Sequence, residues 1–153
     1  NPVSVVEECI ALRNHDRSQQ SSNNTDQEPY VACFAVVDVD DWDSSRNPSS
    51  QLNKAIHLAK DNEIQLLISN LKFEVWLVWH LEGTTPKLTS TELDKQCLHK
   101  KILNGKNLHP DFPLENYENA CIIASRQQKV TPNTKGSNPS SAIPRLFEFL
   151  EEL

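Results

Sequence analysis

The residues best suited to chemistry lie in the stretch FAVVDVDDWD, where an apolar run ends among acidic residues. Asp38 and Asp40 stand two positions apart, and alternate residues of a strand point to the same face. Their carboxylates would then lie within about 6 Å, where an effective dielectric near 20 gives a repulsion of about 3 kcal/mol, or roughly two pKa units. A bound divalent cation such as Mg²⁺ or Mn²⁺ would relieve this repulsion, because such ions prefer oxygen ligands. A solvated turn would relieve it too, and the D-x-D pattern alone does not choose between the two. Asp41 and Asp43 are expected to face elsewhere and to be solvated.

A third acidic candidate, Glu74, follows the next apolar run, EIQLLISN. It could complete a metal shell or act as a general base. It could also be a first-turn helical glutamate, which the helix dipole favours without any chemical role. The catalytic assignment of Glu74 therefore depends on where the fold places it.

Two further side chains are candidates for substrate binding. His80 shares a helical stripe with Phe73 and Trp76, a pattern that also suits a hydrogen-bonded core histidine. His80 and Glu74 lie six positions apart, about 240° around a helix, so they do not form an acid–base dyad. Asn138 lies in the loop KVTPNTKGSNPSS, which could cover a substrate or simply connect two elements.

Charge is distributed unevenly along the chain, which has a formal net charge of −6. Residues 1–90 contain 7 Lys and Arg against 13 Asp and Glu, whereas residues 91–153 contain 8 of each. An acidic half does not attract a polyanion, so a nucleic-acid substrate would need bound metal and the later basic segment. That segment offers four lysines that could contact phosphates or form a solvated helical face: Lys95, Lys100, Lys101 and Lys106.

Strand and helix patterns place the acidic pair at a sheet edge. The run over 30–38 is apolar and rich in valine, which predicts a strand covered on both faces. A helical stripe over 50–62 and a second strand over 63–70 complete a βαβ unit, which closes right-handed with parallel strands. Ligands bind such sheets outside the carboxyl ends of the strands. Both Asp38 and the segment SNLKFE fall at such an end.

Helical patterns dominate the rest of the chain. An amphipathic helix is predicted over 1–15, followed by a polar loop over 16–29. The segment 73–81 fits a strand or a helix, and its closeness to the preceding strand favours a helix. Later helices, one capped by Thr89 or Ser90 and the last capped by Ser141, are predicted over 91–103, 115–128 and 142–153.

The sequence thus predicts a single α/β domain over 1–153 with a parallel sheet core. Its α/β part spans 1–90 and its helical part spans 91–153. None of the four cysteines forms a C-x-x-C pair or a zinc signature, so buried free thiols in a reducing cytoplasm are expected. No stretch is apolar enough to span a bilayer and no signal-peptide pattern opens the chain, which predicts a cytoplasmic protein without a membrane partner.

Four segments, in this order and at similar spacing, resemble the RloB-like (AbiLii-like) proteins of bacterial phage defence: FAVVDVDD, LNKAIHLAKDNEIQLLISN, FEVWLVWHLE and SNPSSAIPRLFEFLEEL. The resemblance covers nearly the whole chain. It implies a Toprim-like domain, in which a D-x-D at a strand end helps to hold Mg²⁺ for phosphodiester chemistry. It also implies an AAA-type ATPase partner with which the protein acts in abortive infection.

The D-x-D maps to Asp38 and Asp40, and the other family blocks map to Phe73, Glu74, Trp76, His80, Asn138, Pro139 and Ser140. Two departures stand out. Leu71 and Lys72 occupy positions where family members usually have Pro and Cys. The family's opening strand, with its CEG-type segment and catalytic Glu, has no counterpart, so the chain is expected to begin downstream of it.

Two functions from different classes follow. The first is a metal-dependent nuclease of phage defence, with Asp38 and Asp40 binding Mg²⁺ or Mn²⁺ and Glu74 as an accessory catalytic carboxylate. The second is a non-catalytic interaction module that docks the ATPase partner. The substrate of the first, whether DNA, transfer RNA or another phosphodiester, is not specified by the residues.

Overall fold

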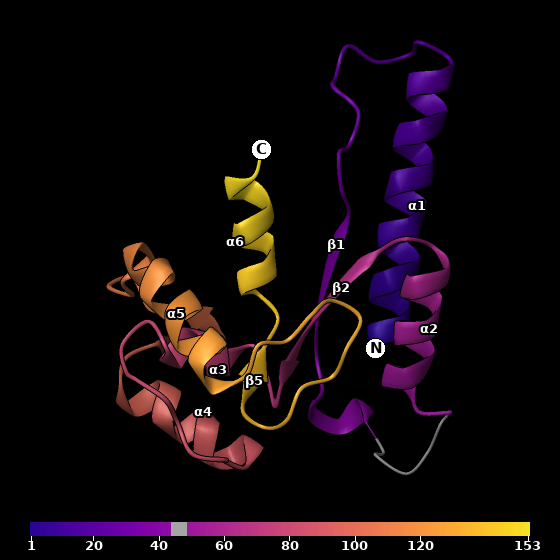
Figure 1. The fold of residues 1–153 in the computed structure, drawn as a ribbon. Coiled ribbons are helices and arrows are strands. Elements are labelled where there is room, and N and C mark those ends of the chain that lie inside the picture. The colour runs from indigo at the N-terminus through magenta and orange to yellow at the C-terminus, as the bar shows by residue number, and fades with distance from the viewer. Residues whose placement is uncertain (44–48) are drawn as a thin grey trace.

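The computed structural model describes residues 1–43 and 49–153 and has a small sheet between two groups of helices (Figure 1). The strand order is β1-β2-β5. β1 (Phe34–Asp38) runs parallel to β2 (Gln65–Asn70), and β2 runs antiparallel to the short β5 (Ser140–Ser141). The predicted α/β class is confirmed, and the sheet is mixed because β5 joins the parallel pair. Across the described residues, no helix has the length and apolarity needed to cross a membrane.

The helices lie on both sides of this sheet. Helices α1 and α2 lie on one side, and α3, α5 and α6 lie on the other, with α4 beyond them (Figure 1). Their bounds are α1 Pro2–Ser21, α2 Gln51–Asp61, α3 Glu74–Val78, α4 Ser90–His99, α5 Tyr117–Gln127 and α6 Pro144–Glu151.

The central strand β2 is covered on both faces. Leu66 and Ile68 pack with α1 and α2 in one core cluster, while Leu67 belongs to a second cluster with α3, α4 and α5. This division follows from the alternation of side chains along a strand.

The edge strand β1 is covered unevenly. Ala35 and Val37 are buried, but Val36 on the opposite face is 40% exposed. The prediction that this strand would be covered on both faces is therefore wrong. On that face the second group of helices covers only the start of β1, where Phe34 packs on Phe149 of α6, and Val36 is left open.

Helix α1 is longer than its apolar pattern predicts. Asn1 caps it by accepting a hydrogen bond from the Val3 amide, and it runs on to Ser21 through residues predicted to be a loop. Two tertiary contacts hold its later turns. Arg13 donates to the carbonyl of Asn62, and Asp16 accepts from the Tyr30 amide at 3.1 Å.

The second half contains short elements that the sequence did not predict. A two-stranded hairpin, β3 (Leu103–Asn104) with β4 (Asn107–Leu108), begins at the last residue of the helix predicted over 91–103. The 3₁₀ helix η2 (Leu114–Asn116) overlaps the start of the helix predicted over 115–128. Ser141 lies in β5 and does not occupy the N-cap position of α6. Its hydroxyl instead bonds to the Ser69 hydroxyl at 2.9 Å, which ties β5 to β2.

Candidate active site

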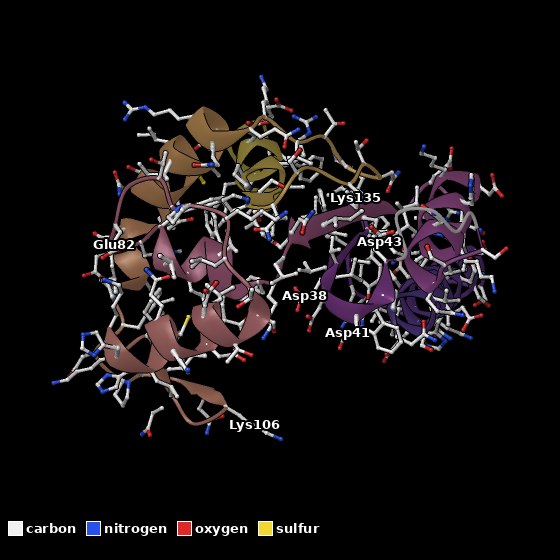
Figure 2. All side chains as sticks on the ribbon, turned by 90° about the horizontal axis from the view of Figure 1, so that it is seen from below. Asp38, Asp41, Asp43, Glu82, Lys106 and Lys135 are labelled. Carbon is white, nitrogen blue, oxygen red and sulfur yellow. The ribbon has the colours of Figure 1, made fainter. Side chains whose placement is uncertain are left out.

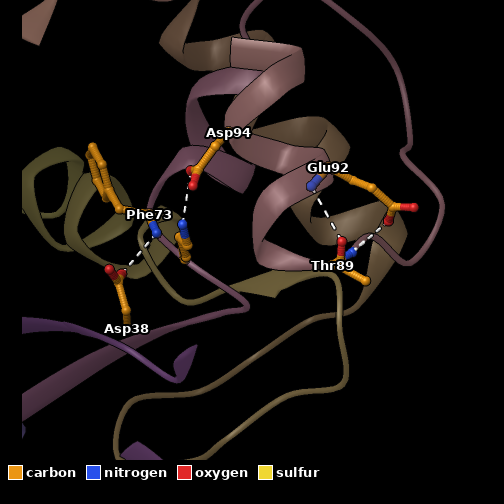
Figure 3. A network of polar contacts seen from close by, with 6 residues as sticks. Asp38, Phe73, Thr89, Glu92 and Asp94 are labelled. Atoms are coloured by element: carbon orange, nitrogen blue, oxygen red, sulfur yellow. Dashed lines mark hydrogen bonds and ion pairs between the residues drawn. The ribbon is translucent and has the colours of Figure 1, made fainter. Parts of the chain in front are cut away.

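The predicted meeting of two segments at the carboxyl end of the sheet is present. Asp38, the last residue of β1, pairs in register with Ser69 of β2. Just beyond β2, the Phe73 amide donates to Asp38 Oδ1 at 2.8 Å (Figure 3), and the Asp40 amide donates to the Leu71 carbonyl at 3.0 Å. Two backbone hydrogen-bond donors thus fasten residues 71–73 against residues 38–40.

Asp40 does not continue the strand. It begins the 3₁₀ helix η1 (Asp40–Trp42), with a positive φ of 28°. The prediction that Asp38 and Asp40 would share a strand face is therefore wrong. Asp40 nevertheless lies near enough to influence the ionisation of Asp38.

The Asp38 carboxyl is the most perturbed acid of the site. Burial raises its pKa from 3.8 to about 6. The Phe73 hydrogen bond opposes this shift, the charges of Glu74 and Asp40 add to it, and the positive charge of Lys72 opposes it. Because burial and the neighbouring acids disfavour the ionised form, a cation beside Asp38 would stabilise its carboxylate and lower its pKa.

Glu74 stands in the first turn of the short helix α3, next to Phe73. Its charge contributes to the raised pKa of Asp38, so the structure places these two acids in one electrostatic environment. Glu74 also lines a largely apolar cavity of about 460 Å³, together with His80 and Lys106.

A separate cavity of about 300 Å³ lies directly beside Asp38. Its walls include Val36 and two aromatic side chains, Trp42 and Phe73, which are 41% and 37% exposed. Asn1 lines it too, so the N-terminal end of α1 borders the carboxylate site. The cavity therefore combines an ionisable group with exposed apolar and aromatic surface.

The two other acids of the stretch differ from each other. Asp41 is exposed, as predicted, but the side chain of Asp43 is only 9% exposed and forms an ion pair with Lys135 (Figure 2). The prediction that Asp43 is solvated is wrong, because its partner comes from the loop before β5. The same loop is anchored where Asn70 donates to the Gly136 carbonyl at 2.8 Å.

Comparison with known proteins adds one finding. A family model for RloB-like proteins matches residues 1–150. The chain belongs to the RloB-like family. No curated protein and no solved structure matches it.

Two positions matched to family blocks lie away from the Asp38 cavity in this RloB-like protein. His80 is 3% exposed, its Nδ1 bonds to the Trp76 carbonyl at 3.0 Å, and its ring packs on Phe112. Asn138 donates to the Leu88 carbonyl at 3.1 Å. These contacts give both side chains structural partners, and their substrate-binding roles stay predictions.

Lys72 and Asp94 are site residues that the sequence analysis missed. Lys72 Nζ lies 2.8 Å from Asp94 Oδ1 on α4, and the Lys72 side chain is only 13% exposed (Figure 3). Burial disfavours its charged form, but the hydrogen bond and charge of Asp94, with the charges of Asp40 and Glu74, outweigh burial and raise the pKa of Lys72. The only sequence signal was that Lys72 departs from the usual family residue.

The donor set suits some metals and not others. Within 1–43 and 49–153, no group of three or more His, Cys, Asp or Glu is arranged to hold a metal ion. A structural zinc site, which takes four protein ligands, does not fit. Mg²⁺ is commonly bound by one or two carboxylates, with water and substrate phosphate completing its shell, and Asp38 with Asp40 fits that smaller set.

Proposed function

We propose that this RloB-like protein is a metal-dependent phosphodiesterase that cleaves nucleic acid in phage defence. A Toprim-like use of Asp38 and Asp40 would hold Mg²⁺ or Mn²⁺. The observation that carries the proposal is the partly buried Asp38 carboxyl, whose pKa is raised to about 6 at the carboxyl end of the sheet. Strongly perturbed acids in a cavity are typical of functional sites.

The chain's own residues would divide the work. The Phe73 amide orients the Asp38 carboxylate through Oδ1, leaving its other oxygen to face a cation. The cation would stabilise negative charge on the attacked phosphate. Glu74, which shares the electrostatic environment of Asp38, would accept the proton of the attacking water.

Nucleic acid is the favoured substrate class because of the aromatic surface beside the acids. Trp42 and Phe73 line the Asp38 cavity and are partly exposed, and unpaired bases stack on aromatic side chains. Stacking would supply attraction that an acidic site does not supply to phosphates. Lys106, which lines the neighbouring cavity with Glu74, would add a positive charge there.

The decisive experiment measures cleavage of labelled single-stranded and duplex DNA and RNA with Mg²⁺, Mn²⁺ or EDTA. We expect metal-dependent cleavage that Asp38→Asn abolishes and Glu74→Gln lowers by a factor of about 10²–10⁴, the usual contribution of a general base. Asp111→Asn is the matched control, because that side chain is 92% exposed and does not line the cavity. Equal activity of Asp38→Asn and the parent protein would overturn the proposal.

An accompanying melt tests the cation site without relying on activity. Binding at about 100 times the dissociation constant should add roughly 2.7 kcal/mol to the free energy of unfolding. The parent protein and Asp111→Asn should show this gain with Mn²⁺, and Asp38→Asn should not. A flat response of the parent protein would count against a carboxylate metal site.

A second candidate function, docking of an AAA-type ATPase partner, is favoured by a different surface. Helices α5 and α6 border an apolar hollow of about 390 Å³, beside which Ile122 is 50% exposed. Ile122→Asp should abolish copurification with the proposed AAA-type ATPase partner. Leu98→Asp, at a 55% exposed position on α4, is the control. Copurification that survives Ile122→Asp would reject this surface as the docking site.

A further inference from the structure

The segment that carries Lys72 is fixed against the acidic pair from both sides. The residue before Lys72 accepts the Asp40 amide through its carbonyl, and the residue after it donates its amide to Asp38. The backbone of Lys72 is therefore held next to both proposed metal ligands. Its position does not depend on the orientation of a free surface side chain.

The ammonium group of Lys72 is held in place as well. Asp94 on α4 bonds it at 2.8 Å, and the Lys72 side chain is 13% exposed, so solvent screens its charge only partly. Burial raises the pKa of the fully buried Cys97 thiol on α4. The charges of Glu74 and Asp94 raise it further, and the charge of Lys72 opposes them. These charges therefore lie close together, between α3 and α4.

We propose that Lys72 is the resident counter-charge of the Asp38–Asp40 site and sets its affinity for divalent cations. This inference rests on the proposed function. The ammonium stabilises the clustered carboxylates when no metal is bound, and it opposes the entry of a second cation. Asp94 limits that opposition, because it draws the ammonium toward α4 and contributes a negative charge of its own.

Opposite effects are expected from the two partners of one ion pair. Removing the charge of Lys72 should tighten cation binding, whereas removing the charge of Asp94 should weaken it. A unit charge roughly 10 Å from a divalent cation changes its affinity by about tenfold at an effective dielectric of about 45, between the values for protein and water. Removing both charges should restore an affinity close to that of the parent protein.

The test is a titration of the full chain with Mn²⁺ alone at low ionic strength, with free Mn²⁺ measured by electron paramagnetic resonance. We expect Lys72→Gln to bind about tenfold more tightly, Lys72→Arg to match the parent, and Asp94→Asn to bind several-fold more weakly. Lys100→Gln is the matched control, because Lys100 forms its ion pair with Glu82, outside both cavities. Adding Asp38→Asn to Lys72→Gln should abolish the tighter Mn²⁺ binding of Lys72→Gln.

The outcomes separate this inference from the function on which it rests. If Lys72→Gln and Asp94→Asn both bind Mn²⁺ with the affinity of the parent protein, the counter-charge role is overturned and the metal site stays in place. Absence of Mn²⁺ binding in every folded variant overturns the proposed metal site itself. If Lys72→Gln alone does not fold, the double variant that removes both charges is compared with Asp94→Asn. The counter-charge role predicts tighter Mn²⁺ binding by the double variant, and equal affinity of the two overturns the inference.

Discussion

Replacing Asp38 by Asn should stabilise this protein at neutral pH, which is unusual for a change at a proposed catalytic site. Asn keeps an oxygen that can accept the Phe73 amide, so the hydrogen bond at 2.8 Å can persist. Asn cannot ionise, so the cost of a partly buried charge near Glu74 and Asp40 disappears. Stability given up for function is common at active sites.

The size and sign of the effect follow from the pKa of Asp38, about 6 in the folded protein against an ordinary 3.8. Between these pH values the folded state binds more protons than the unfolded state, so the free energy of unfolding falls as pH rises through the window. At about 1.36 kcal/mol per unit, the full shift corresponds to about 3 kcal/mol. Screening of this partly exposed carboxyl reduces the expected gain at pH 7 to about 1–2 kcal/mol.

The assay is urea unfolding at several pH values between 3.5 and 7.5 in EDTA, a range chosen to bracket both pKa values. It is followed by the fluorescence of the buried Trp76 and Trp79. Asp38→Asn and the parent protein should have similar stability near the lower end, where Asp38 is mostly protonated in both states, and should diverge above it. Asp111→Asn, at a 92% exposed side chain, should follow the parent throughout.

Two results would refute this reasoning. One is a parallel pH dependence of the parent protein and Asp38→Asn, which would mean that the carboxyl titrates alike in both states. The other is a loss of stability in Asp38→Asn at pH 7. In that case the charged carboxylate, through the Phe73 amide or the nearby Lys72, would stabilise the fold more than its burial costs.

Two further predictions concern the framework around the site. Gly136→Ala should lower the free energy of unfolding by about 1–3 kcal/mol, because a Cβ there would lie 2.3 Å from Ser140 Oγ and 2.7 Å from Val130 Cγ2. Gly83→Ala, where nothing lies within 4 Å of the added carbon, is the control, and equal urea midpoints would contradict the packing argument. Thr89→Ala should cost about 1 kcal/mol, because Thr89 and Glu92 form a reciprocal capping box at the start of α4. Thr91→Ala, at an exposed position inside α4, should change the free energy of unfolding by less than about 0.5 kcal/mol. If Thr89→Ala costs as little as Thr91→Ala, the capping role of Thr89 is contradicted.

The sequence by itself determined the βαβ unit and the two segments that meet at the edge of its sheet. Val37 and Leu67 lie in runs long and apolar enough to predict strands, and the stripe around Leu52 and Ala55 predicts the helix between them. Parallel strands linked by a helix bring their carboxyl ends to one edge. That rule alone predicts that Asp38 and the segment after β2 meet, as the Phe73 hydrogen bond confirms.

Only the tertiary structure decided how the charges at that edge are paired. Lys72 meets Asp94 across 22 positions, and Lys135 meets Asp43 across 92, so no local pattern could reveal either pair. Asp40 leaves the strand where its amide bonds to the carbonyl of residue 71, a contact between segments that follow two different strands. Periodicity reports which face of an element is apolar, whereas the partners of a buried charge depend on how separate elements pack.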